Sequence, residues 1–356
     1  MKTLNLAIIG QGRSGRYIHG NYYRSEDNRF YTVKYVVELD AARRARAAMD
    51  YPGCTVLADY HELFACSDID LVVNASYSEM HYPITKELLT HGFNVLVEKP
   101  FARRRSECDE LIALAKEKGV LLAVFQQSNL APFFLFAKEL VKSGKLGEIK
   151  QIKLSYNGFA RRWDWQTLQK RCAGNSYNTG PHPICIALSL MDNDPNIRVV
   201  YSKLDRMLNY GDSDDFCKII LDAPGKPFAD LEMHSNDAYN PYNLKLLGSL
   251  GTFQCTLSEY KMTYIVLGEN PDQVLVEDFL QDANGNPVYC SENLIKHQQE
   301  GTFPSDVSAI GAAALYEELY WAITEGKEMS VTPQMAAQVV EVLETVHAQN
   351  PLPVKF

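Results

Sequence analysis

The first candidate for chemistry is a carboxylate followed directly by an ammonium. Glu98 and Lys99 come immediately after an apolar run at residues 94–97, and Pro100 follows them. The run has the pattern of a buried strand, so both charges are expected at its carboxyl end, where open α/β sheets bind their ligands. An exposed ion pair ahead of a turn proline explains the same residues without chemistry. From these residues alone, both interpretations remain open.

A second candidate is a histidine held between two prolines. His182 stands between Pro181 and Pro183, just before an apolar run with a helical pattern. The prolines stiffen the backbone on both sides of it. Oxidation of a secondary alcohol needs a base near the reacting hydroxyl, and a neutral imidazole serves that purpose near pH 7. A lone histidine is more often structural, so residue type leaves this choice open too.

A glycine-rich motif lies near the N-terminus. Gly10-Gln11-Gly12-Arg13-Ser14-Gly15 directly follows an apolar run at residues 4–9. The first glycine would allow a tight turn, the second a close approach to a pyrophosphate, and the third close packing of a helix on the sheet. A carboxylate is then expected at the end of the second strand. Glu38 fits that position, and Asp40 is a weaker candidate.

This carboxylate bears on the choice of nucleotide. In such a position it accepts hydrogen bonds from the ribose hydroxyls and repels a 2′-phosphate. The motif therefore predicts a dinucleotide site that prefers NAD to NADP, although a tight turn alone also accounts for the glycines.

The elements that would position these groups follow from hydrophobic periodicity. Short apolar runs alternate with helical patterns in the first third of the chain, which predicts a Rossmann-type doubly wound α/β domain over residues 1–125. Helices are expected at 84–90 and 106–118, the second with Ser106 as N-cap and Gly119 at its end. The expected strands are residues 4–9, 32–37, 55–58, 71–75, 94–97 and 120–125.

After residue 125 the pattern changes. Alternating strand patterns dominate and helices are sparse, which predicts an α+β domain over residues 126–356 with a large, mostly antiparallel open sheet. Residues 282–287 form a turn cluster. Helices are expected at 132–142, 307–324 and 333–347, and strands at 149–156, 197–205, 216–221, 229–234, 244–247 and 261–267.

Composition narrows the class of protein. The chain has 356 residues, of which 46% are hydrophobic and 22% charged, and its net charge is −9. These values exclude a disordered chain and argue against nucleic acid as a partner. The basic runs at 43–46 and 103–105 are interpreted as helix surface. The eight cysteines show no metal-ligand spacing, so no metal site is expected, and they suit a reducing compartment, the cytoplasm. No apolar run is long enough to span a membrane.

Taken together, the motifs point to a known family. The chain resembles the Gfo/Idh/MocA group of NAD(P)-dependent oxidoreductases, which act mainly on sugars, inositols and related polyols. The resemblance rests on the glycine motif with Glu38, on Leu71–Ser76 followed by His81, on Glu98-Lys99-Pro100, and on the segment from Gly174 to His182. It also covers the entry into the second domain at 146–149, so it runs along nearly the whole chain.

The resemblance implies roles for particular residues. Lys99 and His182 would be catalytic, the lysine stabilising charge on the reacting oxygen and the histidine acting as base. A structural link between Lys99 and the cofactor ribose is the alternative for the lysine. His81 is expected to be structural or at the edge of the cofactor. The residues implied to bind the cofactor are Gly10, Gly12, Arg13, Ser14, Gly15, Glu38, Asn74, Ser76, His81, Glu98 and Lys99.

Several positions depart from the family pattern. Asn178 stands where an aspartate is usual, Cys185 replaces another aspartate, and Tyr77 replaces a proline. Ser128 and Asn129 stand where arginines are common. Asn178 can hydrogen-bond the His182 ring but adds no charge, and both the N-terminal dipole of the following helix and desolvation disfavour the protonated ring, so we expect the histidine to be neutral at pH 7.

Substrate contacts are predicted more loosely. Aromatic and polar residues near the histidine segment could stack on a sugar face and bind its hydroxyls, although ordinary packing explains them equally well. These candidates are Tyr156, Arg162, Trp163, Asp164, Tyr177, Asn178 and His182.

The resemblance leaves three functions open. The first is NAD-dependent hydride transfer to or from a hydroxyl of a sugar, inositol or related polyol. The second is a glycosidase or lyase that uses tightly bound NAD for transient oxidation. The third is a non-catalytic sensor of NAD or sugar on the same fold. The family also implies a homo-oligomer, a dimer or tetramer, formed through the sheet of the second domain.

Overall fold

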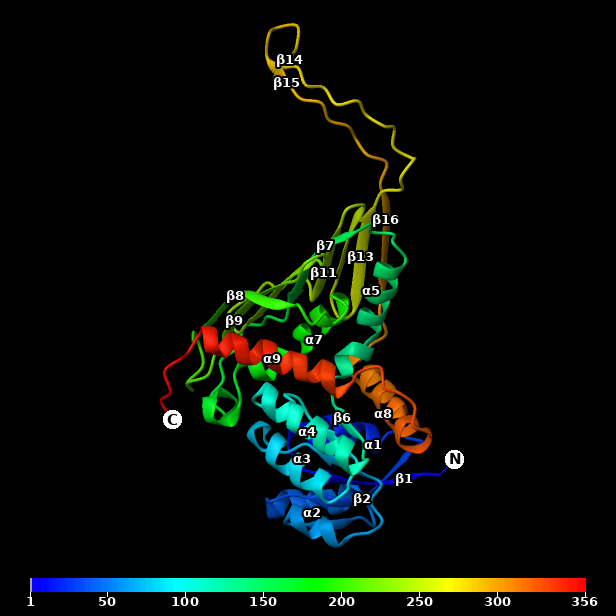
Figure 1. The fold of residues 1–356 in the computed structure, drawn as a ribbon, viewed down its shortest axis with the longest axis vertical. Helices are drawn as coiled ribbons and strands as arrows, with labels where there is room; N and C mark the ends of the chain where they lie inside the picture. The colour runs from blue at the N-terminus through cyan, green and yellow to red at the C-terminus, as the bar shows by residue number, and fades with distance from the viewer. Residues whose placement is uncertain (1) are drawn as a thin grey trace.

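The computed structural model describes residues 2–356 and contains two large sheets (Figure 1). The first sheet has six parallel strands in the order β3-β2-β1-β4-β5-β6. Residues of β1, β4, β5 and β6 are almost all buried, as expected for strands covered on both faces. The strands are Leu4–Ile9 (β1), Tyr31–Val37 (β2), Thr55–Leu57 (β3), Leu71–Asn74 (β4), Val95–Val97 (β5) and Leu122–Val124 (β6).

Helices cover this sheet and complete a doubly wound Rossmann-type layer. The glycine motif opens a π-helical segment, Arg13–His19, that continues into α1 (Gly20–Tyr23). The other helices are α2 (Ala41–Asp50), α3 (His81–Thr90) and α4 (Arg105–Lys118). The predicted α/β class of the N-terminal region is confirmed.

The second sheet has eight strands in the order β16-β13-β12-β11-β7-β10-β9-β8. Every pair is antiparallel except β7 with β10. The sheet is therefore mostly antiparallel, as predicted. Its strands are Ile149–Ser155 (β7), Arg198–Asp205 (β8), Phe216–Asp222 (β9), Phe228–His234 (β10), Leu244–Gly248 (β11), Gly251–Cys255 (β12), Glu259–Tyr264 (β13) and His297–Thr302 (β16).

The helices of the second half connect the two layers. The inner face of the large sheet packs on α5 (Pro132–Lys142), α7 (Pro181–Leu190) and part of α9 (Pro333–Gln349). In contrast, α8 (Val307–Glu325) returns to the first sheet, where Leu315, Tyr316 and Leu319 join the core formed by β1, β2 and β4. The chain after 126 thus contributes to both cores. No helix among residues 2–356 has the length and hydropathy needed to cross a bilayer.

Some sequence-based details differ from the structure. Ser106 does not cap α4, because the N-cap is Arg104, and the Glu107 carboxylate accepts hydrogen bonds from the backbone N–H groups of Arg103 and Arg104. Gly119 does end the helix, in the left-handed conformation. The strands β12 and β16 were not expected, since their polar sequences lack a strong alternating pattern. The turn cluster at 282–287 joins the two-residue strands β14 (Leu280–Gln281) and β15 (Pro287–Val288).

The glycine motif yields a matched test of packing. A Cβ on Gly15 would lie 1.9 Å from the Gly10 carbonyl oxygen, whereas a Cβ on Gly12 would have no atom within 4 Å. We expect Gly15→Ala to lower the free energy of unfolding by about 1–3 kcal/mol. Gly12→Ala should change it by less than about 0.5 kcal/mol. Urea unfolding of both variants measures this difference, and equal losses would contradict the packing described.

Candidate active site

The glycine loop is shaped by close backbone approaches. Gly10 has φ +91°, and its N–H donates to the Val37 carbonyl oxygen at 2.8 Å. A Cβ there would meet the Ala75 carbonyl oxygen at 2.4 Å, so only glycine fits. Beyond it, Gly12 faces open space at the start of the Arg13–His19 segment. The loop therefore leaves room for a group to approach the backbone at a helix N-terminus, where anions are favoured.

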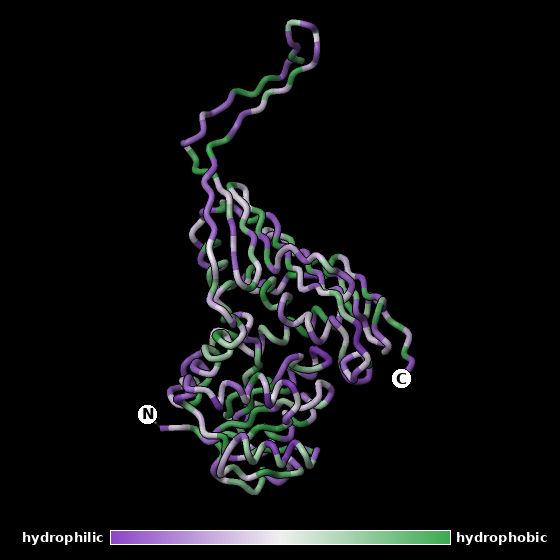
Figure 2. The backbone as a smooth tube through the Cα atoms, turned by 180° about the vertical axis from the view of Figure 1, so that it is seen from behind, coloured by the Kyte–Doolittle hydropathy of each residue, from purple (hydrophilic) through white to green (hydrophobic). Residues whose placement is uncertain are grey.

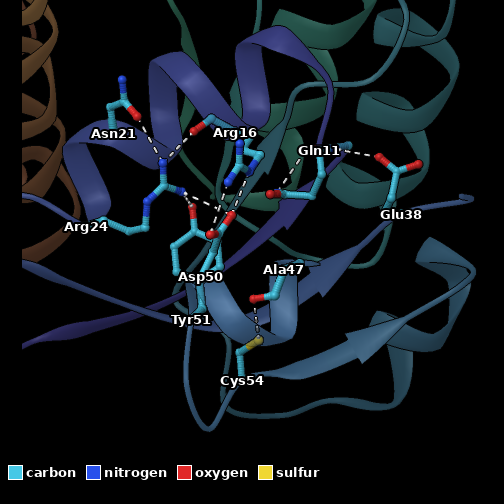
Figure 3. Close-up of polar contacts among 10 residues, drawn as sticks. Gln11, Arg16, Asn21, Arg24, Glu38, Ala47, Asp50, Tyr51 and Cys54 are labelled. Atoms are coloured by element: carbon cyan, nitrogen blue, oxygen red, sulfur yellow. Dashed lines mark hydrogen bonds and ion pairs between the residues drawn. The ribbon is translucent and has the colours of Figure 1, made fainter. Parts of the chain in front are cut away.

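A basic pocket of about 510 Å³ opens beside this loop. Arg13, Arg16, Arg43 and Arg46 line it together with Gln11, Gly12 and Tyr17. Arg16 is held by Asp50, with 2.7 Å between Nε and Oδ2 (Figure 3). The interpretation of residues 43–46 as plain helix surface was therefore incomplete, because Arg43 and Arg46 face a cavity. Four guanidinium groups around one pocket suit a ligand with phosphate groups.

Glu38 lies at the end of β2 and is 7% exposed. Its carboxylate accepts hydrogen bonds from the backbone N–H of Gln11 at 2.7 Å and of Asp40 at 3.0 Å. Figure 3 shows the Glu38 side chain pointing toward the glycine loop. The Arg43 guanidinium is 3.9 Å away. The weaker candidate, Asp40, instead caps α2 by accepting from the Arg43 N–H at 2.8 Å.

These residues fit a dinucleotide. The space beside Gly12 is open, and arginines line the pocket next to it. The Glu38 carboxylate has lone pairs left for a ligand after it accepts from two backbone N–H groups. The Gln11 side-chain oxygen is buried without a hydrogen-bond partner among residues 2–356, which suits a polar ligand at this loop.

The fourth strand ends in a closed network. Asn74 is fully buried and donates to the His81 carbonyl oxygen and to Thr85, while its own oxygen accepts from the Ser76 hydroxyl at 2.7 Å. The His81 ring contacts the carbonyl oxygens of Pro100 and Ser76, at 2.7 and 3.3 Å. Burial lowers the pKa of His81, so the ring is neutral and donates to only one of these carbonyls, and the shorter contact favours Nδ1–H as the donor to Pro100. His81 thereby joins the end of the fourth strand to the loop after β5.

Glu98 anchors the lysine motif from beneath. Its carboxylate lies 3.1 Å from His19 Nε2 and accepts from the Lys99 backbone N–H at 3.0 Å. The other ring nitrogen of His19 contacts the hydroxyl of Tyr316 in α8. Burial opposes the ionisation of Glu98, but His19 and Lys99 outweigh it and lower the pKa of this carboxyl to about 2. Glu98 is therefore a buried anion that fixes the backbone of Lys99.

Lys99 reaches across to the second domain. Its Nζ donates to the Asn178 carbonyl oxygen at 2.9 Å, in the short helix α6 (Asn175–Asn178). Burial lowers the pKa of this ammonium, and the positive charge of Arg13 adds to that effect. Its contact with Asn178 places the ammonium within the same site as the histidine segment.

His182 lies in the first turn of α7, and Ser128 orients its ring. The distance from Ser128 Oγ to His182 Nδ1 is 2.7 Å. The other nitrogen, Nε2, makes no hydrogen bond within residues 2–356. Desolvation and, to a lesser extent, the positive charge of Lys99 lower the pKa of His182 to about 3. The ring is thus neutral at pH 7, as expected from the sequence.

The partner of that ring differs from the expectation. The side-chain oxygen of Asn178 accepts from Gln166 at 3.3 Å instead of contacting His182. Ser128, noted in the sequence only as a departure from the family, makes the contact because its segment, residues 127–130, packs against α7. A pairing across 54 positions leaves no local sequence signal.

The candidate substrate residues separate into two groups. Arg162, Gln166 and Asn178 line a polar recess together, with Asn175, Asn209 and Asp214. Asp164 forms an ion pair with Arg162 at 2.8 Å, and Trp163, between them in sequence, is 76% exposed.

Two of the candidate substrate residues lie away from this recess. Tyr177 is buried, donates to the Arg103 carbonyl oxygen and stacks on His347, so it serves packing, and Tyr156 packs against the core of the large sheet.

A further contact between the two halves was missed in the sequence. Arg171 pairs with Glu79, and its guanidinium lies 5.3 Å from the centre of the Tyr77 ring. Tyr77 in turn meets Trp165 edge-on at 5.1 Å. Tyr77, noted as a replacement for proline, therefore joins the end of β4 to the segment that leads into α6.

Comparison with known proteins agrees with this architecture. Residues 4–126 match the model of the oxidoreductase family with an NAD-binding Rossmann fold, and residues 134–254 match the GFO/IDH/MocA C-terminal domain. An NAD-binding protein from Listeria innocua has a similar structure, with TM-score 0.80 and 20% identity over 98% of each chain.

Two curated relatives match over shorter segments. An uncharacterized oxidoreductase of Schizosaccharomyces pombe is 31% identical over 192 residues, 53% of this chain and 52% of that protein. The scyllo-inositol 2-dehydrogenase (NADP(+)) IolW of Bacillus subtilis is 29% identical over 190 residues, 53% and 52% of the two chains. The match thus spans about half the length of these relatives. Because the family models cover both domains, the chain belongs to the Gfo/Idh/MocA oxidoreductase family.

Proposed function

We propose that this protein is an NAD-dependent oxidoreductase that transfers a hydride between nicotinamide and a hydroxyl-bearing carbon of a sugar, inositol or related polyol. One observation carries the proposal. The ammonium of Lys99, from the first domain, lies in the same site as the imidazole of His182, from the second domain. This site is at the edge of the parallel sheet, and the glycine loop at that edge fits a dinucleotide. The name of IolW, an inositol dehydrogenase, supports the substrate class.

The chain's own residues divide the work of the reaction. When bound, the nicotinamide would supply the hydride acceptor or donor. Lys99 donates a hydrogen bond to the reacting oxygen and stabilises negative charge on it. His182 takes the hydroxyl proton at Nε2, while its Nδ1–H donates to Ser128 and keeps the ring in the required tautomer. The polar recess lined by Arg162, Gln166 and Asn178 has a volume of about 10 Å³, so it offers room for one further hydroxyl.

We place the protein in the cytoplasm. All eight cysteines are free thiols, and five of them, Cys108, Cys172, Cys185, Cys217 and Cys255, are buried in the cores. Reduced thiols in this number suit a compartment that keeps cysteines reduced.

Glu38 should set the choice of nucleotide. Wild type is expected to bind NADH more tightly than NADPH, because the carboxylate accepts the ribose hydroxyls and repels a 2′-phosphate. Glu38→Gln keeps the acceptor for the Gln11 N–H but removes the charge, so relative affinity for NADPH should rise roughly tenfold or more. Adding Arg43→Ala should reverse that gain, since Arg43 is the nearest cation. Titration of both nucleotides measures the preference, and tighter NADPH binding by wild type would contradict the assignment.

Lys99 and His182 should both be needed for turnover. With a panel of inositols, aldoses and polyols, Lys99→Met should lower kcat by about 10²–10³-fold. His182→Asn should lower it by about 10²–10⁴-fold. Lys118→Met, at an exposed lysine ending α4, is the matched control and should keep wild-type turnover.

The nicotinamide absorbance band and the melting temperature of each folded variant are the measurements. Near-normal turnover in either site variant would refute its role. Cleavage of a glycoside with the nucleotide still bound would support the lyase or glycosidase alternative, and binding without any reaction would support the sensor.

The depressed pKa of His182 predicts the shape of the pH profile. Because the pKa is about 3, the free protein holds the neutral base throughout the range above about pH 4–5. The kcat/KM for oxidation should therefore show no acidic limb from His182 between pH 5 and 8. Ser128→Ala should lower kcat by about 10–100-fold through misplacement of the ring, with KM little changed. An acidic limb near pH 6.5 that disappears in His182→Asn would contradict this prediction.

A further inference from the structure

A long hairpin arm, residues 267–296, projects from the end of the large sheet between β13 and β16 (Figures 1 and 2). Only its tip has regular structure, in the two-residue strands β14 and β15. Each side of the arm has about 14 residues, which in extended form reach roughly 45 Å. Both views show the arm pointing away from the rest of the chain.

Large apolar side chains on this arm have no partner within the described chain. Val274 is 88% exposed, Leu275 83%, Phe279 102% and Tyr289 89%. Leu267 and Ile295, near its base, are 75% and 53% exposed. Single exposed apolar residues are ordinary on a protein surface, but so many on one narrow segment mark an interaction site.

The backbone of the arm is also largely unpaired. Its two sides form a ladder only at Leu280 with Val288 and Gln281 with Pro287. Outside this tip and its turn, the cross-arm hydrogen bonds among residues 2–356 involve side chains: Gln273 donates to Glu292, and the Ile295 N–H donates to the Asn270 side-chain oxygen. An isolated two-stranded hairpin of this kind is marginal in water, so packing against another surface must stabilise it.

The charge of the arm indicates what that surface is like. The arm carries six carboxylates, Glu269, Asp272, Glu277, Asp278, Asp282 and Glu292, against one lysine, Lys296. A segment that is both apolar and strongly acidic fits a surface that combines apolar side chains with lysines.

The outer face of the eight-stranded sheet has this combination. Leu154, Leu246 and Met262 are buried on the inner face, so Lys153, Lys245 and Lys261, one residue before each, point outward. Lys153 pairs with Lys245 in the ladder, and Gln254 joins Lys245 to Lys261. Asp230 beside Lys153 and Glu300 beside Lys261 end this cross-strand row of lysines, while Lys245 and Lys261 form no ion pair among residues 2–356. The same face carries Phe228, 40% exposed, together with Ile220, Leu247 and Tyr201.

We propose that the arm of one copy of this chain lies across the outer face of the large sheet of a second copy. In a two-fold pair, each acidic arm reaches the lysine row of its partner, and both contacts form together. The arrangement covers the exposed apolar side chains and the unpaired backbone of both arms. It also gives the expected oligomer, formed through this sheet, a specific contact. The proposal stands independently of the catalytic function.

Removal of the arm tests this directly. Replacing residues 267–294 by Asn-Gly leaves a six-residue connection centred on Asn-Gly between the last pair of β13 and β16, Tyr264 with His297, and leaves both sheets intact. Sedimentation velocity at about 10 µM should show a dimer or tetramer for the full chain and a monomer for the shortened one. Nucleotide binding and the melting temperature confirm that the shortened chain is folded. A monomeric full chain, or a shortened chain that keeps the oligomeric mass, would overturn the proposal.

Point variants test the contact without shortening the chain. Leu275→Ser with Phe279→Ser should weaken self-association by at least about tenfold. Met49→Ser with Leu135→Ser, at exposed positions on α2 and α5, should leave it unchanged.

Charge reversal tests the receiving surface. Lys245→Glu with Lys261→Glu should also weaken association, and adding Glu277→Lys with Asp278→Lys should restore it, because opposite charges then face each other again. Lysine variants that associate like wild type, or a failure of the added lysines to restore association, would exclude this face.

Discussion

The hydrogen bond from Lys99 Nζ to the Asn178 carbonyl oxygen, 2.9 Å long, is the constraint on which the site depends. The lysine belongs to the end of β5 in the first sheet, and Asn178 belongs to α6, which leads directly into the helix of His182. A shift of either domain would separate the ammonium from the imidazole. The contacts between the halves, from Arg171 with Glu79 to Arg103 with the Gln169 carbonyl oxygen, limit such a shift.

In the same site, burial and neighbouring charges determine the protonation states of Glu98 and His182. Glu98, beneath the lysine, is an anion despite its burial, because His19 and Lys99 compensate it. Removing one partner of such a buried group is costly, so the Glu98–His19–Tyr316 chain ties the lysine motif firmly to α8. His182 has no carboxylate partner, and burial beside Lys99 keeps it neutral. The Glu98 anion opposes the loss of the proton from Lys99, and His182 remains uncharged, which matches the proposed electrostatic stabiliser and base.

Much of the fold was predictable because its periodicity is strong. The buried strands β1, β4 and β5, the proline-started helix α5 and the glycine motif are all visible in local sequence. The return of α8 to the first core was not predictable, because Tyr316 meets His19 across 297 positions. The same holds for Ser128 with His182, and for the arginines of the pocket, which resemble ordinary helix surface in sequence. The residue types alone identified the candidate site residues, but the three-dimensional structure is needed to show which of them are in contact.

The central claim is that a hydride passes between nicotinamide and a hydroxyl-bearing carbon in this site. The most direct measurement supplies NADH with deuterium at both C4 positions together with ketose or inosose substrates, and analyses the product by mass spectrometry. Our account predicts that deuterium appears on the carbon that becomes the CH–OH group, and that His182→Asn greatly slows its transfer. A reduced product without the label, or transfer that proceeds unchanged in His182→Asn, would contradict it.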